Sequence, residues 1–220
     1  MDDFVSLSSL NFFQLQTNCL RFEKTKEGFL PKSILERYDL PDTTGLSGED
    51  AFARVALGWN NEGIGCTILV KEPFVEAHYP EIQKGNSVEL FLDTRDMKNT
   101  GFNTRFCHHF FFLPKEVDEV SRGEMTHFRT EDTHELCDPK ELQLKSAFSA
   151  KEHTIQIFIP RQCLYGYDPE QFDRLGFTYR INRPKMPAQH FVVLSSEFQI
   201  DQQPSLWASL RLINGENSSK

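Results

Sequence analysis

The chain has 220 residues, a formal net charge of −8 and no run of basic residues. Phosphate backbones and anionic membrane surfaces attract proteins mainly through Lys and Arg, so this composition argues against nucleic acid and membranes as partners. The length suits one domain with a full hydrophobic core. We expect that domain over residues 1–213, with an N-terminal extension over 1–45 and a disordered polar tail over 214–220.

The cysteines give an expectation about the compartment. They are Cys19, Cys66, Cys107, Cys137 and Cys163, an odd number without a Cys-x-x-Cys pair. A secreted disulfide framework normally has an even number, so we expect reduced, mostly buried thiols. The start, Met1-Asp2-Asp3, has no secretory signal, and no stretch reaches the ~18 apolar residues of a spanning helix. These features predict a cytoplasmic protein.

Short segments of period two dominate the chain, and 20 phenylalanines favour strands over helices. One short helix is expected at Lys32–Tyr38 and a single turn at Pro169–Arg174. The pattern predicts an all-β fold with one or two short helices, and by itself it fits a sandwich or a barrel. The expected strands are Phe12–Phe22, Ala51–Trp59, Ile64–Val70, Ser87–Asp93, Thr104–Leu113, Met125–Thr130, Leu142–Ser149, His153–Ile159, Gly176–Arg183, Phe191–Leu194 and Leu206–Leu212.

The clearest hairpin joins Ala51–Trp59 to Ile64–Val70. The connection Asn60-Asn61-Glu62-Gly63 contains residues that tolerate positive φ, as a tight turn requires.

The strand Ser87–Asp93 is the most informative segment. Val88, Leu90 and Leu92 alternate and should enter the core, which leaves Glu89, Phe91 and Asp93 on the other face. Carboxylates accept hydrogen bonds from hydroxyl groups and an aromatic ring packs on C–H groups, so this face suits a polyol.

Two further strands should extend this face. Thr104–Leu113 is expected to turn Phe106, His108, Phe110 and Phe112 inward, and Gly176–Arg183 to turn Phe177, Tyr179 and Ile181 inward. The expected polar face then consists of Glu89, Asp93, Arg105, His109, Arg180 and Asn182. The alternative is a solvated sheet face with ordinary ion pairs.

We expect no metal centre. His108 and His109 are neighbours on a strand and point to opposite faces, and His134-x-x-Cys137 is an isolated pair. The nearest cofactor candidate is calcium at Asp93, Asp96 and Asn99, which share one loop; the alternative is a polar turn.

Nothing in the chain indicates an enzyme. Nucleophile, dinucleotide and P-loop motifs are absent. Glu89 and Asp93 would lie roughly 13 Å apart along one strand, beyond the spacing of glycosidase carboxylates.

Three segments carry a family resemblance. Ala53-Arg54-Val55-Ala56-Leu57-Gly58-Trp59-Asn60-Asn61-Glu62-Gly63 resembles the alternating strand, Trp and acidic-Asn turn of family 9 carbohydrate-binding modules and their DOMON-like relatives. Gly85-Asn86-Ser87-Val88-Glu89-Leu90-Phe91-Leu92-Asp93 resembles their "DSVEIFID" strand, and Pro204–Leu212 their closing strand. The stretch that runs from Leu92-Asp93-Thr94-Arg95-Asp96 through His108–Pro114 is more similar still to uncharacterised bacterial proteins with this domain.

The resemblance implies an antiparallel, jelly-roll-like β-sandwich that binds sugar chain ends without catalysis. It implies that Glu89 bonds sugar hydroxyls and that Arg105 is the nearest match to a basic sugar ligand. The family also holds sugar between two Trp side chains. Here the corresponding places hold Gln83, with Tyr79 nearby, and Asp201, with Phe198 nearby, while Trp59 and Trp207 match packing positions.

We therefore expect a glycan- or polyol-binding domain whose ligand residues include Tyr79 with the polar face. The alternative is a cytoplasmic structural or protein-interaction domain that has lost sugar binding, existing as a monomer or a homodimer. A haem-binding relative is a third reading, with Met97, Met125 and Met186 as the available axial ligands.

Overall fold

The computed structural model describes residues 14–23 and 28–215. None of the described helices is long and apolar enough to span a membrane. The elements are β1 (Gln16–Arg21), η2 (Lys32–Tyr38), α1 (Thr44–Ser47), β2 (Ala53–Asn60), β3 (Gly63–Val70), η3 (Ile82–Lys84), β4 (Ser87–Asp93), β5 (Cys107–Val117), β6 (Val120–Glu124), β7 (Gln143–Phe148), β8 (His153–Pro160), η4 (Arg161–Cys163), β9 (Arg174–Arg183), β10 (Met186–His190), η5 (Pro204–Leu206) and β11 (Ala208–Ile213), where η marks a 3₁₀ helix.

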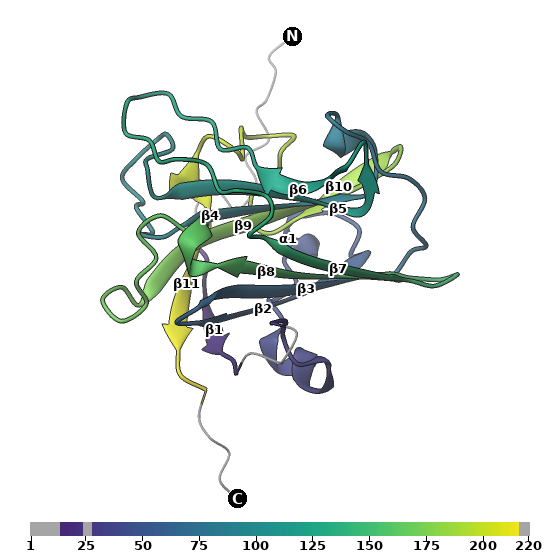
Figure 1. The fold of residues 1–220 in the computed structure, drawn as a ribbon, viewed down its shortest axis with the longest axis horizontal. Helices are drawn as coiled ribbons and strands as arrows, with labels where there is room; N and C mark the ends of the chain where they lie inside the picture. Colours follow the sequence, from purple (N-terminus) through teal and green to yellow (C-terminus); the bar gives the residue numbers. More distant parts are fainter. Residues whose placement is uncertain (1–13, 24–27, 216–220) are drawn as a thin grey trace, which may run out of the picture.

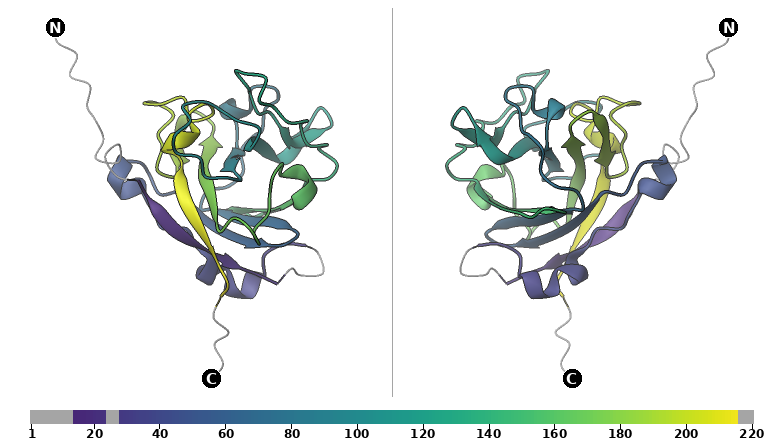
Figure 2. Two further views of the ribbon diagram at one scale, coloured as in Figure 1. Left: turned by 90° about the vertical axis from the view of Figure 1, so that its left-hand side faces the viewer. Right: turned by 90° about the vertical axis from the view of Figure 1, so that its right-hand side faces the viewer.

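The strands form two stacked layers that meet along one side (Figure 1). Their order is β6-β5-β4-β9-β11-β1-β2-β3-β8-β7, with β10 paired to β9. We call β4, β5, β6, β9 and β10 the upper layer, and β1, β2, β3, β7 and β8 the lower layer. Figure 2 shows β11, in yellow, running beside β1 where the layers join. The predicted all-β sandwich is thus confirmed, with one departure, because β1 pairs in parallel with β11 and β2.

Alternating apolar residues from both layers fill the space between them. Val88, Leu90 and Leu92 of β4 are fully buried there, as expected. The inward direction predicted for β9 is also confirmed. The central core includes Val55, Leu57, Ile64, Cys66, Ile68, Phe110, Phe112, Ile155, Ile157, Phe177, Tyr179 and Ile181.

The described part of the N-terminal segment covers the outer face of the lower layer. Phe22 and Leu30 pack there against two glycines, Gly58 and Gly65. A Cβ at Gly58 would lie 2.9 Å from Leu30 Cδ2, and one at Gly65 would lie 2.8 Å from Phe22 Cζ. The glycines therefore permit this close approach, and the segment leaves the outer face of the upper layer to other elements.

The β2–β3 hairpin turns at the predicted place. Gly63 has φ +149°, and a Cβ there would lie 2.1 Å from the carbonyl oxygen of Ile159 on β8. Only a residue without a side chain fits this position.

We predict that Gly63→Ala lowers the free energy of unfolding by about 2 kcal/mol or more, because the added methyl group meets backbone rather than a movable side chain. Gly101→Ala is the matched control, since a Cβ there has no neighbour within 4 Å. Its expected effect is within about 0.5 kcal/mol. Urea denaturation measures both, and equal stability of the two variants would contradict the prediction.

Two predicted strands are wrong. Met125–Thr130 is a loop, and the strand lies earlier, at β6, after a two-residue turn in which Asp118 and Glu119 have positive φ. Phe191–Leu194 is also a loop, because Val192 has φ 72° and ends the pairing that β10 makes with β9. Both true strands are short and lie at edges, so they lack the alternation that marks a half-buried strand.

One further expectation is corrected. β5 does not end at Pro114 but continues to Val117, because the pairing with β6 shifts register between Phe112 and Val117 and this irregularity accommodates the proline. The segment Pro169–Arg174 forms a single turn, in which the amides of Gln171 and Phe172 donate to the carbonyl oxygen of Asp168. The predicted disordered tail covers residues 214–220, and its part beyond Gly215 lies outside the described residues.

The expectation of five reduced thiols is wrong for two of them. Cys137 and Cys163 form a disulfide, which joins the loop after β6 to η4. Cys19, Cys66 and Cys107 are free and buried. The pairing escaped prediction because an odd count and a separation of 26 residues indicate no particular partner.

Alkylation of the denatured, unreduced protein should therefore label three thiols, Cys19, Cys66 and Cys107, and prior reduction should raise the number to five. Mass spectrometry counts the labels. Five labels without reductant, on protein purified under air, would contradict the disulfide.

Candidate functional site

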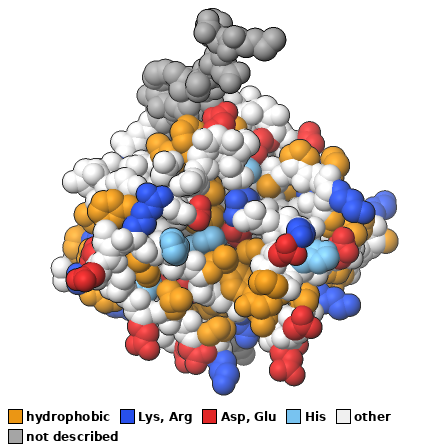
Figure 3. All heavy atoms as spheres, turned by 90° about the horizontal axis from the view of Figure 1, so that it is seen from above, with side chains coloured by type: hydrophobic (Ala, Val, Ile, Leu, Met, Phe, Trp, Pro, Cys, Tyr) orange, Lys and Arg blue, Asp and Glu red, His pale blue; other side chains and the backbone are white. Residues whose placement is uncertain are grey.

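A row of paired residues crosses the outer face of the upper layer. Phe111 of β5 lies opposite Glu89 of β4, Glu89 opposite Arg180 of β9, and Arg180 opposite His190 of β10. Directly paired residues of antiparallel strands share a face, so these side chains are neighbours. Figure 3 looks onto this face, where basic, acidic and histidine side chains gather in a hollowed middle bordered by hydrophobic ones.

Glu89 is the centre of a hydrogen-bonded group that we call the outer polar cluster: Glu89, His109, Arg180 and Asn182. Arg180 donates from Nε to Oε1 at 2.7 Å and from Nη2 to Oε2 at 2.6 Å. Asn182 Nδ2 donates to Oε1 at 2.7 Å, and His109 Nε2 lies 2.9 Å from Oε2. The Glu89 side chain is completely buried, so its charge is balanced by the protein itself.

Glu89 is ionised at neutral pH. Burial raises the pKa of its carboxyl group, but the hydrogen bonds and charges of His109 and Arg180 outweigh burial and hold the pKa at about 2. The carboxylate thus orients Arg180 and His109 permanently rather than binding and releasing protons near pH 7.

Aromatic packing holds His109 from a second side. Its ring stacks on Phe91 with centroids 4.2 Å apart, and Phe91 in turn lies beside Trp207 with centroids 5.8 Å apart. The Glu89 carboxylate and the Phe91 ring therefore both hold the His109 imidazole in place, which pre-organises the cluster.

Tyr79 adds an exposed ring beside the cluster. It stacks on Phe111 with centroids 5.9 Å apart and remains 41% exposed. A pocket of about 390 Å³ opens next to this pair, within the range of small-molecule sites. Its lining also includes Glu116, Glu119, Val120, Ser121, Arg122, Gly123, Glu124, Pro139 and Lys140.

Two of the expected ligand residues lie apart from the cluster. Arg105 is exposed and forms an ion pair with Asp132, because β5 begins only at Cys107 and Arg105 sits in the turn before it. Asp93 is buried and accepts hydrogen bonds from the amides of Arg95 and Met97 at 2.9 and 2.7 Å. Its carboxylate therefore shapes the following loop.

The calcium candidate has the contacts of a polar turn. Besides Asp93, Asp96 accepts a hydrogen bond from Ser209 at 2.6 Å and pairs with Lys98 at 2.6 Å. These partners occupy the oxygens that a calcium ion would need.

His190 is a member of this surface that the sequence did not reveal. Its Nδ1 lies 2.6 Å from Glu49 Oε1, and its Nε2 lies 2.8 Å from the Ser195 hydroxyl. His190 could be recognised only from the pairing of β10 with β9. The strand predicted from the sequence, Phe191–Leu194, begins one residue after it.

Comparison with known proteins gives structural matches only. No family model matches the chain, and no curated protein matches it. Among solved structures, it is similar to a family 9 carbohydrate-binding module from Caldicellulosiruptor kristjanssonii in complex with cellotriose, with a TM-score of 0.64, 13% identity and coverage of 93% of this chain and 97% of that one. A second structure of such a module from this organism, in complex with glucose, gives a TM-score of 0.61, 13% identity and coverage of 92% and 97%.

A protein from Bacteroides uniformis proposed to bind carbohydrate is also similar, with a TM-score of 0.55, 8% identity and coverage of 90% of this chain and 99% of that one. At these identities the likeness concerns the fold. The chain thus has the fold of the family 9 carbohydrate-binding modules, as the resemblance predicted. Trp59 and Trp207 are 5% and 1% exposed, which confirms them as packing residues.

We predict that Glu89→Gln lowers the free energy of unfolding by about 3 kcal/mol near neutral pH, because it leaves the buried Arg180 without a counter-charge. The pKa of Glu89 is depressed to about 2 from an ordinary 4.5. Its contribution should be complete above the ordinary pKa and disappear as the pH falls toward the depressed one. The variant should lack this part of the acid dependence.

Urea denaturation at several pH values measures this difference. Glu81→Gln is the matched control, since its ion pair with Lys84 is on the surface and should contribute less than about 1 kcal/mol. An identical fall in stability with acid in wild type and Glu89→Gln would contradict the assigned role.

Proposed function

We propose that the outer face of the upper layer binds a carbohydrate or polyol without catalysis. The observation that carries this proposal is the arrangement of Arg180, which is held on that face by Glu89 through Nε and Nη2. The third guanidinium nitrogen of Arg180, Nη1, takes no part in these two hydrogen bonds and can donate to a hydroxyl group of a ligand. Arg180 and His109 are largely buried, at 8% and 5% exposed, so a ligand would contact the small accessible part of each fixed side chain.

Tyr79 supplies the apolar half of such a site. Sugar rings present C–H groups that pack on an aromatic face while their hydroxyls take hydrogen bonds. Phe111, which supports Tyr79, is two strands away from Arg180, about 10 Å at the usual strand spacing. A short oligosaccharide can bridge that distance better than a single ring.

The fold supports the same ligand class. The two similar structures of a family 9 module from Caldicellulosiruptor kristjanssonii are complexes with cellotriose and with glucose. The protein class that the fold suggests is therefore a non-catalytic sugar-binding domain, and cellotriose is a reasonable first ligand to test.

The structure alters the role that we assign to Glu89. The resemblance implied direct bonds from Glu89 to sugar hydroxyls, but this carboxylate is enclosed and already has protein partners. We infer that Arg180, His109 and Tyr79 contact the ligand and that Glu89 and Asn182 position them. With no exposed Trp pair in the described residues, we expect millimolar affinity.

The enclosed Glu89 and the buried tryptophans also favour the second candidate, a structural or protein-interaction domain that has kept the fold. Its cytoplasmic location remains a proposal, and the Cys137–Cys163 disulfide removes the argument from reduced thiols.

Titration of the full chain with cellotriose, followed by calorimetry or NMR, tests the first candidate. Tyr79→Ala and Arg180→Lys should each weaken binding about tenfold, or ~1.4 kcal/mol, because the first loses the ring and the second loses the planar fork. Phe148→Ala is the control: this ring is 50% exposed on β7, in the other layer.

Unchanged affinity in both variants would move the site elsewhere on the protein. If neither cellotriose nor a glycan array binds to the wild-type chain at millimolar concentration, the interaction-domain candidate replaces this one.

A further inference from the structure

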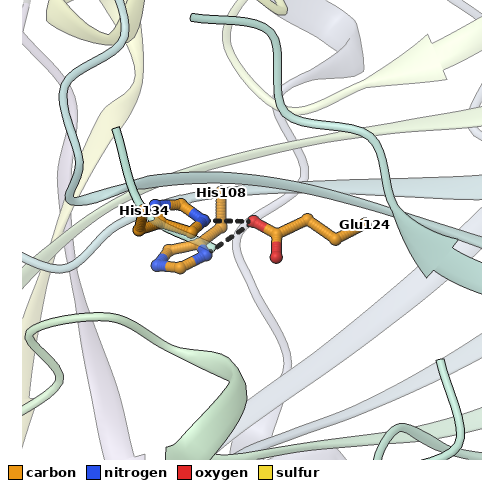
Figure 4. A group of neighbouring side chains, drawn as sticks. All are labelled: His108, Glu124 and His134. Atoms are coloured by element: carbon orange, nitrogen blue, oxygen red, sulfur yellow. Dashed lines mark hydrogen bonds and ion pairs between the residues drawn. The ribbon is translucent and has the colours of Figure 1, made fainter. Parts of the chain in front are cut away.

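A second cluster of ionisable side chains lies on the opposite face of β5 from the outer polar cluster. His108 belongs to β5, Glu124 ends β6, and His134 comes from the loop between β6 and β7 (Figure 4). Their side chains are 0%, 0% and 2% exposed. His108 Nδ1, Glu124 Oε1 and His134 Nε2 all lie within 4.8 Å of one another.

The hydrogen bonds of His134 leave a proton to be explained. Nδ1 lies 2.7 Å from the carbonyl oxygen of Arg105, and Nε2 lies 2.9 Å from Glu124 Oε1. Both neighbours are acceptors, whereas a neutral imidazole has only one N–H. A proton on Nδ1 donates to the carbonyl oxygen of Arg105, which is how ligand histidines are commonly oriented, and leaves the Nε2 lone pair facing Glu124 Oε1, where a cation would lie between the two atoms.

Both oxygens of Glu124 have hydrogen-bond partners, so a bound cation would take the place of the contacts between Oε1 and the two imidazoles. Its Oε1 faces three groups: His108 Nδ1 at 2.8 Å, His134 Nε2 at 2.9 Å and the Thr126 hydroxyl at 2.7 Å. Its Oε2 accepts the amide of Cys137 at 2.8 Å. Nδ1 of His108, like Nε2 of His134, is aimed at Oε1, so the two imidazoles and the carboxylate converge on one point.

We propose that His108, Glu124 and His134 bind a divalent transition-metal ion, with zinc as the best match. Two imidazoles and one carboxylate form a donor set typical of zinc. Tetrahedral ligands about 2.0–2.1 Å from zinc are about 3.3 Å apart. Binding would widen the contacts of 2.8 and 2.9 Å to Glu124 Oε1 and set the two imidazole nitrogens, which lie within 4.8 Å of each other, to the same spacing. Thr126 or a water molecule is available for the fourth position.

The surroundings indicate a structural ion rather than a reaction centre. His108 stacks on Phe110 and His134 on Tyr165, with centroids 5.6 and 5.9 Å apart, so rings enclose the group. The segment between β6 and β7 has no regular secondary structure over residues 125–142, and such long loops need anchoring. The ion would attach this loop to β5 through His134, beside the disulfide of Cys137.

The sequence analysis predicted no metal centre from two residue pairs, His108 with His109 and His134 with Cys137. The structure agrees that neither pair can bind a metal by itself. His108 and His109 do lie on opposite faces of β5, and Cys137 is in a disulfide. The third ligand, Glu124, comes from a strand that the sequence did not predict.

The test uses the full chain without a histidine tag, stripped with a chelator and then titrated with Zn²⁺. We expect uptake of one ion per chain by elemental analysis and a rise in Tm of several degrees. Glu124→Gln and His134→Gln should each weaken the affinity at least about tenfold. His127→Ala is the matched control, because His127 is exposed in the same loop.

Co²⁺ substitution of the wild-type chain gives a readout that needs no variant. Visible absorption typical of four-coordinate Co²⁺, displaced by Zn²⁺, supports the site even if a variant does not fold. Absence of uptake by the wild-type chain, or uptake retained in both folded variants, would overturn the proposal. Sugar binding is measured separately, so either result leaves the carbohydrate proposal intact.

Discussion

The upper layer depends on the two hydrogen bonds that the Arg180 guanidinium donates to the Glu89 carboxylate. β4 is buried on both faces along its whole length, so the carboxylate of Glu89 in the middle of the strand cannot be hydrated. Arg180, His109 and Asn182 replace the missing water from the two neighbouring strands. The pairing of β4 with β5 and β9 is therefore specified by charge as well as by the alternation of apolar residues, and the same contacts fix the side chains that reach solvent.

β5 connects the two clusters because consecutive residues point in opposite directions. His109 completes the outer polar cluster, and His108 points between the layers toward Glu124. In the outer polar cluster both oxygens of Glu89 accept hydrogen bonds from fixed donors, and Nη1 of Arg180 is left to donate to a neutral ligand. In the second cluster two imidazole nitrogens face one carboxylate oxygen, which suits a cation. Both clusters combine histidine with glutamate, but only the outer one adds an arginine and an asparagine.

The sequence predicted those parts that depend on local alternation. Glu89, His109, Arg180 and Asn182 were placed together because three adjacent strands keep regular register there. The expected position of Arg105 on this face was wrong, because β5 starts two residues after it. Glu124, His134 and His190 depend on edge strands and a long loop, where no periodic signal exists. The disulfide required knowledge of which loops meet in space, and that is set by the packing of the two layers.

The opposed histidines of β5 also constrain how this protein can change through evolution. Insertion or deletion of a single residue within the strand would turn His109 toward the interior and His108 toward solvent, so both clusters would be lost in one event. A change of two residues would keep each face but shift every cross-strand partner. Length variation should therefore accumulate in the connecting loops of related sequences, while the span from Cys107 to Phe112 keeps a constant number of residues.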